Sequence, residues 1–265
     1  MNDQTPQFTY SDEAFRQLVS FSYNCMLNTG YDLTNVDTTK IFQTNDIVET
    51  VKYVTEGKVI LQNQSHKGAN ILLKNPDEIH IYVETINQSP YNVIEVLCHE
   101  MIHSYDTYRF AEKYTNGKLS DTGSYMLGDT FDNFSEFHAY LYANYYTPYF
   151  AQLAQGISLD TNPLTPVVNF LESYFEQMSD QQVADWLAYN IFQSLGLLYV
   201  VDLYYKSIEQ NYDVENCLHN IFDPAGIADI VLQIYYTCIR LMYADDIDDD
   251  LQQLASLCDQ LGLQK

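Results

Sequence analysis

Two histidines four residues apart, with a glutamate directly after the first, are the residues of this sequence best suited to chemistry: His99, Glu100 and His103. An α-helix turns about 100° per residue, so both imidazoles project within about 40° of each other and can bind one metal ion. Glu100 lies beside them, where its carboxylate can take a proton from a water that the metal activates and later pass it to a leaving amine. The three residues predict half of a zinc site for metal-assisted hydrolysis.

The segment around this motif predicts a helix. Ser89 suits the N-cap and Pro90 the first helical position. Apolar residues on either side of the polar edge would anchor the helix: Val93, Ile94, Val96, Leu97, Met101 and Ile102.

A β-hairpin is expected just upstream of this helix. Residues 70–74 and 78–84 read as strands joined by a turn at residues 75–77, which contains a proline. In the second strand Ile79, Ile81 and Val83 alternate onto one face.

The motif from His99 to His103, preceded by a hairpin, resembles the HExxH zinc metallopeptidases, the zincins. In that family an edge strand above the metal helix holds the substrate backbone, so the resemblance implies that a substrate strand pairs with residues 79–83. It also implies an α+β fold, with a small antiparallel or mixed sheet packed on the metal-binding helix and a mainly α-helical C-terminal lobe. We expect residues 1–150 to form the zincin-like catalytic lobe and residues 151–265 an all-helical lobe that completes the same catalytic unit.

A zinc site needs a third protein ligand and an open position for water. Metzincins place that ligand six residues after the second histidine, following a glycine, but Arg109 and Asp106 stand at those positions, which excludes that branch. Gluzincins take a glutamate from a later helix. Residues 132–143 read as such a helix, and the gluzincin resemblance implies that Glu136 binds the zinc.

Two other ligands remain open as alternatives. Alanines share the helix face of Glu136 and would let the two ligand helices approach closely, whereas His138 points roughly the other way. Asp106 lies on the face of the two histidines one turn later. If Asp106 is not a ligand, we expect its carboxylate to hydrogen-bond an imidazole and fix its tautomer.

A hydrolytic zinc site also needs a donor for the oxyanion on the scissile carbonyl. The 24 tyrosines offer many candidates; Tyr140 and Tyr105 are near in sequence, and His219 is a distant one. Tyr140 stands four residues after Glu136, where the thermolysin-like pattern has an aspartate. This departure weakens the resemblance to the thermolysin branch and leaves the expected metal site unchanged.

The charge of the chain is strongly negative. It has 36 acidic against 12 basic residues, a net charge of -24, and a pI near 4.2. Such a surface repels the phosphates of nucleic acids and anionic membranes and favours a basic protein partner or substrate. A solvated surface that aids solubility explains the same excess.

Cysteine usage predicts a reducing compartment, and the N-terminal residues bear on whether the chain is exported. The five cysteines are scattered without a C-x-x-C pair, which predicts no disulfide framework. Residues 1–4 lack a basic and an apolar segment, so we expect no signal peptide, and the apolar stretch 195–205 is interrupted by Asp202 and too short to span a bilayer. We expect a cytoplasmic protein, with export by a route that needs no signal peptide left open.

The other expected elements follow from capping and periodicity. They are a helix at residues 11–21, a strand at residues 59–61 that would pair with the hairpin, a helix opened by Pro163 and Pro166, a helix capped by Ser179, a helix starting at residues 223–226, and a final helix behind the acidic run 245–250.

Two hypotheses on function follow. The first is a zinc-dependent metalloprotease that cleaves a specific protein; the abundance of Asn, Tyr, Ile and Gln is typical of AT-rich genomes, where exported effector proteases are one class. The alternative is a non-catalytic acidic interaction module or inhibitor with a zincin-like fold. Glu100 favours the enzyme, because a binding module has no need of a carboxylate beside two aligned histidines.

Overall fold

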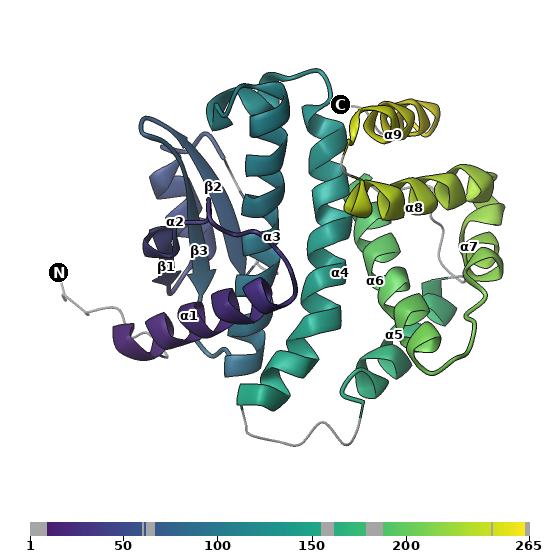
Figure 1. Cartoon of the computed structure of the whole chain (residues 1–265), viewed down its shortest axis with the longest axis horizontal. Helices are drawn as coiled ribbons and strands as arrows, with labels where there is room; N and C mark the ends of the chain where they lie inside the picture. Colours follow the sequence, from purple (N-terminus) through teal and green to yellow (C-terminus); the bar gives the residue numbers. More distant parts are fainter. Residues whose placement is uncertain are drawn as a thin grey trace. The chain divides into compact units, whose positions relative to one another are not determined.

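The computed structural model describes residues 10–59, 61, 67–154, 162–178, 188–244 and 246–262. Contacts divide the chain into two compact units, one of Met1–Thr122 with Tyr146–Ile157 and one of Gly123–Tyr145 with Ser158–Lys265. The fold is mixed α+β, with a small mixed sheet and a helical C-terminal region, as the sequence predicts (Figure 1). The expected division into lobes of residues 1–150 and 151–265 stays a prediction.

The first unit contains a three-stranded sheet. Its strands are β1, Ile41–Thr44, β2, Gly68–Lys74, and β3, Asp77–Glu84, in the order β1-β3-β2. β2 and β3 are antiparallel, which confirms the predicted hairpin, and β1 runs parallel to β3. β3 is therefore the central strand.

The order of the strands overturns two expectations. β3 lies between β1, which pairs with residues 81–84, and β2, which pairs with residues 77–83. Residues 81–83 are therefore paired on both sides, and a substrate strand cannot pair along the whole of residues 79–83 as expected. The third strand is β1 and not residues 59–61: Val59 and Leu61 lie outside any strand, and residue 60 is not described. Leu61 packs against the core formed with β2, so burial alone accounts for its apolar side chain.

Helix α3, Pro90–Tyr114, carries the two histidines and begins where the sequence predicts. The Ser89 side chain caps it by accepting a hydrogen bond from the backbone N–H of Asn92 at 3.2 Å. Helix α1, Asp12–Asn28, packs against α3 and is capped by Ser11, which confirms the helix predicted from residue 11.

One face of the sheet points toward α3. Side chains alternate along a strand, and the register places Gly68 opposite Val83 and Asn70 opposite Ile81 on that face. The Asn70 side chain donates a hydrogen bond from Nδ2 to Ser104 Oγ of α3 at 2.7 Å. Sheet and helix are thus joined by apolar packing and by a side-chain hydrogen bond.

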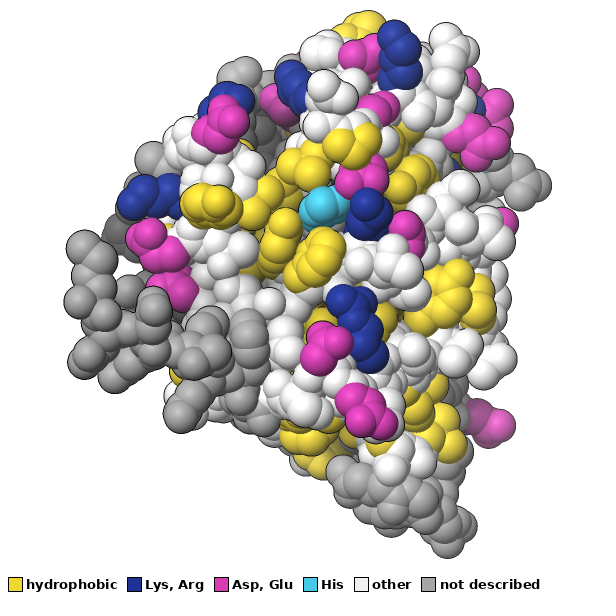
Figure 2. Space-filling model, turned by 90° about the vertical axis from the view of Figure 1, so that its left-hand side faces the viewer, with side chains coloured by type: hydrophobic (Ala, Val, Ile, Leu, Met, Phe, Trp, Pro, Cys, Tyr) yellow, Lys and Arg dark blue, Asp and Glu magenta, His cyan; other side chains and the backbone are white. Residues whose placement is uncertain are grey.

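The opposite face of the sheet is covered in part by α2, Ile47–Val54. Ile47 and Val51 form a small core with Ala69 and Ile71 of β2. The rest of this face carries three half-buried rings, those of Phe42, His80 and Tyr82. Figure 2 shows hydrophobic side chains gathered around a histidine on the side of the chain where the strands lie in Figure 1.

Helix α4, Gly128–Ala154, contributes residues to both units. It contains the predicted helix of residues 132–143 and extends beyond it at both ends. At the start, Phe131 is only 3% exposed, so burial of this ring favours an additional turn. Pro148 lies inside the helix; the hydrogen bond that it cannot make is offset by burial of the following turn, where Phe150 is 4% exposed.

The remaining described elements of the second unit are helical. They are α5, Thr165–Met178, α6, Ala188–Ser207, α7, Val214–Phe222, a short 3-10 turn, Asp223–Ala225, α8, Ala228–Tyr243, and α9, Asp248–Gln260. α5 confirms the helix expected after Pro166, and three aspartates of the acidic run form the first turn of α9. The helix expected to start at residues 223–226 begins later, at Ala228, and α7 was not predicted. Ser179 lies outside the described residues.

Asp202 joins two helices of the second unit. It is 7% exposed and accepts hydrogen bonds from Tyr235 Oη of α8 at 3.3 Å and from Lys206 Nζ at 2.7 Å. The charge that interrupts the apolar stretch of α6 is therefore an internal bridge. Within the described part of the chain, every helix is too short or too polar to traverse a bilayer.

Gly196 allows α6 to approach α4 closely. A Cβ atom at Gly196 would collide with the carbonyl oxygen of Phe137 and lie 3.2 Å from the backbone nitrogen of Leu141.

We expect Gly196→Ala to destabilise the protein by about 1–3 kcal/mol, because backbone atoms cannot yield as a flexible side chain can. Thermal unfolding followed by circular dichroism would show a lower midpoint. Gly123→Ala is the matched control, since no atom lies within 4 Å of its Cβ position, and an unchanged midpoint for Gly196→Ala would contradict the prediction.

Candidate metal centre

His99 and His103 converge along one edge of α3. Their Nε2 atoms are 3.0 Å apart, and the ring centroids are 4.7 Å apart with an interplanar angle of 79°. Both side chains are half-buried. Two imidazoles bound to one tetrahedral Zn²⁺ place their nitrogen atoms about 3.3 Å apart, so this arrangement is close to the one that zinc requires.

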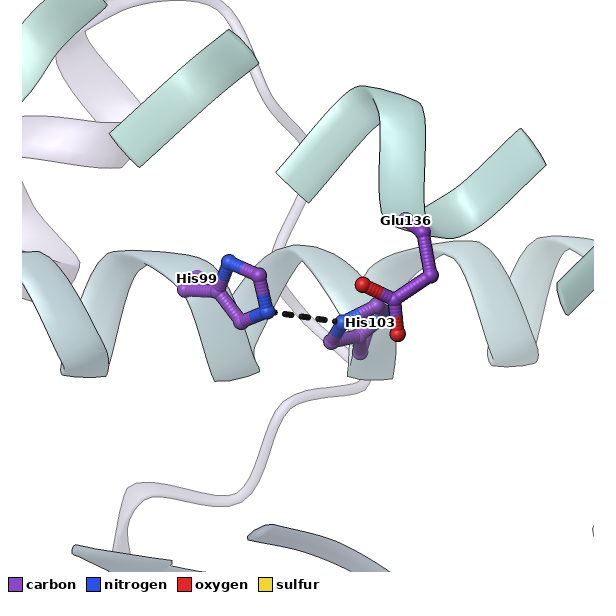
Figure 3. A group of neighbouring side chains, drawn as sticks. All are labelled: His99, His103 and Glu136. Atoms are coloured by element: carbon purple, nitrogen blue, oxygen red, sulfur yellow. Dashed lines mark hydrogen bonds between the residues drawn. The ribbon is translucent and has the colours of Figure 1, made fainter. Parts of the chain in front are cut away.

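Glu136 of α4 supplies a third donor. One ligand atom each from His99, His103 and Glu136 can be chosen so that all lie within 4.8 Å of one another (Figure 3). In Figure 3 the Glu136 carboxylate points toward the His103 ring. Among the described residues, this group could hold a metal ion, and it contains the two histidines and the glutamate that the sequence analysis selected.

The donor set fits a zinc ion. Two imidazole nitrogens and one carboxylate oxygen form a common ligand set of catalytic zinc sites, in which a fourth position stays open for water or substrate. The nearest cysteine in the sequence, Cys98, is fully buried, and burial raises the pKa of its thiol well above the usual range, so this thiol serves packing.

The Glu136 carboxyl is costly to ionise without a cation. Burial, and to a smaller degree the nearby charge of Asp132, raise its pKa to about 8, while a hydrogen bond from Gln193 opposes the rise. A buried carboxylate is stable only with a compensating charge or hydrogen bonds, and a divalent cation is the strongest such partner. The environment of Glu136 is therefore suited to a metal ligand.

Gln193 connects Glu136 to Tyr140. Its Nε2 donates a hydrogen bond to the Tyr140 hydroxyl oxygen at 2.7 Å, and its side chain also hydrogen-bonds the Glu136 carboxyl. Glu136 and Tyr140 are four residues apart on α4 and share a face. This amide therefore orients a candidate ligand and the candidate oxyanion donor together.

Glu100 is held close to the start of β2. It is 7% exposed, and its backbone carbonyl accepts a hydrogen bond from Asn70 Nδ2 at 3.1 Å. A Cβ atom at Gly68 would lie 2.5 Å from Glu100 Oε1. The carboxylate is thus confined by the sheet.

The other predicted candidates lie outside the metal group. Asp106 is fully buried on α3, and His138 is 2% exposed and stacks on Phe134 with ring centroids 5.8 Å apart. Tyr105 contacts Tyr31 edge to face. None of these contacts tests the assignment of Glu136 over Asp106 or His138, which stays a prediction.

His219 lies in the last turn of α7 and contacts a carboxylate just beyond its end. Its Nδ1 lies 2.9 Å from Asp223 Oδ1, and the hydrogen bond to this carboxylate raises the pKa of His219. A cation at this position also interacts favourably with the C-terminal end of the helix.

Sequence reasoning missed three residues of this region, namely Gly68, Asn70 and Gln193. Asn70 is a polar residue in a strand, on the face that alternation assigns to the core. Gln193 interrupts an apolar run in which Phe192 and Leu195 are fully buried. A polar side chain on a buried face is the available signal, but its partner comes from a distant segment.

We expect the purified protein to bind one Zn²⁺ per chain, as measured by elemental analysis and by competition with a chromophoric chelator. His103→Gln should weaken zinc binding by more than about 100-fold, because even loss of a residue that only supports a ligand commonly costs 10–100-fold. His80→Gln is the matched control, since His80 bonds Glu78 on β3 and is not part of the group. Equal zinc affinity of the two variants would exclude the site.

Comparisons of the chain with models of protein families, with curated proteins and with solved structures give no match. Its function is therefore inferred from the side chains described above and their geometry.

Proposed function

We propose that this protein is a zinc-dependent metallopeptidase that hydrolyses a peptide bond in a protein substrate. The observation that carries the proposal is the group of His99, His103 and Glu136, with ligand atoms within 4.8 Å of one another and the Glu100 carboxylate directly after the first histidine. A Zn²⁺ ion held there would polarise the scissile carbonyl and lower the pKa of water.

Glu100 is the proposed general base. Its carboxylate would take one proton from the attacking water and later deliver that proton to the leaving amine, so that the carboxylate is restored at the end of the reaction. A general base must lie within about 3 Å of the group whose proton it takes. Because β2 and α3 confine Glu100, its carboxylate would be held in one place for this transfer.

Tyr140 is the proposed donor to the oxyanion. Because Gln193 Nε2 donates to the Tyr140 oxygen, the hydroxyl hydrogen of Tyr140 is directed away from Gln193. A hydroxyl with its orientation fixed before the reaction stabilises developing negative charge without further reorganisation.

The proposed place for an extended substrate is the outer edge of β2. Among the described residues β2 pairs with β3 alone. The backbone N–H of Glu84 donates to the Lys67 carbonyl at 2.7 Å, so by alternation the backbone groups of Gly68, Asn70 and Leu72 point away from β3. Gly68 also lies beside Glu100, which would bring a substrate on this edge near the general base.

A second candidate function, recognition of a basic protein, is favoured by one observation. The second unit contains a cavity of about 650 Å³ lined by three carboxylates, Glu172, Glu176 and Asp213, beside the rings of Phe175 and Tyr212. Such a lining suits a lysine or arginine side chain, with a carboxylate for the charge and a ring for the alkyl stem. This recognition would serve a peptidase and a non-catalytic binder alike.

The substitution Glu100→Gln separates the two functions. Loss of the general base should lower peptide hydrolysis by about 10²–10⁴-fold, because proton transfer contributes that factor, and zinc content should stay at the parent value. Hydrolysis is measured on a mixture of fluorescence-quenched peptides rich in lysine and arginine. Glu112→Gln, an exposed position on the same helix, is the control.

The outcomes of this experiment are distinct. A parent protein without zinc excludes the metallopeptidase. Zinc-loaded Glu100→Gln that cleaves peptides at the parent rate excludes the role of Glu100. Binding of the same peptides that survives Glu100→Gln, in a parent that does not cleave them, supports the binding module.

A further inference from the structure

Gly68 stands where a side chain would occupy the space of Glu100. A Cβ atom built on Gly68 would lie 2.5 Å from Glu100 Oε1, 2.8 Å from Glu100 Cγ and 2.6 Å from Val96 Cγ1. Ordinary contacts of a Cβ atom begin at 3.4 Å. The β2 backbone at Gly68 therefore passes so close to the Glu100 side chain that no room remains for a Cβ atom.

The backbone conformation of Gly68 does not itself require a glycine. Its φ angle is not positive, unlike those of Gly30, Gly57 and Gly117, and it lies in regular register opposite Val83. The feature that explains a glycine here is space: only hydrogen fits between the strand and the carboxylate.

The same strand fixes the helix at this point. Asn70, two residues along β2, donates from Nδ2 to the Glu100 carbonyl at 3.1 Å and to Ser104 Oγ at 2.7 Å. Asn70 thereby holds the backbone of α3 at Glu100, while Gly68 limits the side chain of the same residue. The Glu100 side chain, 7% exposed, has little room for another rotamer.

We propose that Gly68 is a positioning residue, which sets the place of the Glu100 carboxylate by close approach of the β2 backbone. This inference rests on the proposed role of Glu100 as general base. An alanine at position 68 must move Oε1 by about 1 Å to reach an ordinary contact, and a displacement of that size costs up to about 100-fold in rate.

The test uses Gly68→Ala with Gly123→Ala as its control, a glycine without any atom within 4 Å of its Cβ position. An alanine at position 68 also collides with Val96. Gly68→Ala is therefore also made in a Val96→Ala protein, where the collision with Val96 is removed and the collision with Glu100 stays. The position of the Glu100 carboxylate is then compared between crystal structures of Val96→Ala and of Gly68→Ala/Val96→Ala. We expect it to be displaced in the second protein; coincident carboxylates would overturn the proposal, whether or not the protein binds zinc.

The second measurement is the affinity of the zinc-loaded protein for acetohydroxamate. Acetohydroxamate would bind a zinc ion held there through its oxygens and would give its hydroxyl proton to a carboxylate beside the metal. Its affinity would therefore report the position of Glu100 without a known substrate. We expect Gly68→Ala to weaken binding by about 10–100-fold. The same substitution in a Glu100→Gln protein should cause no further loss, since a residue that acts only through Glu100 is not additive with it.

The outcomes distinguish the inference from the proposed function. If Gly68→Ala weakens acetohydroxamate binding equally in the parent and in the Glu100→Gln protein, the substitution damages the protein in general. That result would refute the proposal that Gly68 positions Glu100. A parent protein that binds no zinc refutes the metallopeptidase, and the crystallographic comparison then still decides whether Gly68 sets the position of Glu100.

Discussion

One constraint governs the candidate site: a single helix must bury an apolar face and present a polar edge in fixed geometry. With 3.6 residues per turn, His99 and His103 fall on one edge of α3, while Val93, Leu97 and Met101 are fully buried on other faces. Burial of these side chains fixes the rotation of the helix about its axis. That rotation sets the direction in which both imidazoles point, whereas the 3.0 Å separation of their Nε2 atoms follows from the helical repeat and the two side-chain rotamers.

The sheet adds a constraint that the helix alone does not provide. Asn70 binds the backbone of α3 at Glu100, and Gly68 brings the strand against the side chain of the same residue. A carboxylate on a free helix samples several rotamers, and only some of them would reach a water beside the histidines. β2 thus restricts the residue on which the proposed chemistry depends.

Capping residues, apolar periodicity and strand alternation predicted most of the elements that could be predicted from the sequence. The α3 helix follows from Ser89, Pro90 and the apolar period, and the hairpin follows from strict alternation in residues 78–84. Strand order did not follow, because β1 has four residues, too few for a clear pattern, and pairs with β3 across some 40 positions of sequence.

The supporting residues of the site escaped prediction for a similar reason. The partners of Gly68 and Asn70 lie about 30 positions away, and those of Gln193 more than 50. Their roles depend on which segments fold against each other. Motif spacing identified the residues that could bind and react, and the tertiary contacts identified those that hold them.

The outer edge of β2 has a further consequence. Backbone groups that can receive an extended peptide can also receive a strand from another copy of the protein, so an available edge invites self-association. The net charge of -24 opposes this, because two such chains repel each other at low ionic strength. The acidic composition would then keep the molecules dispersed and the strand edge accessible.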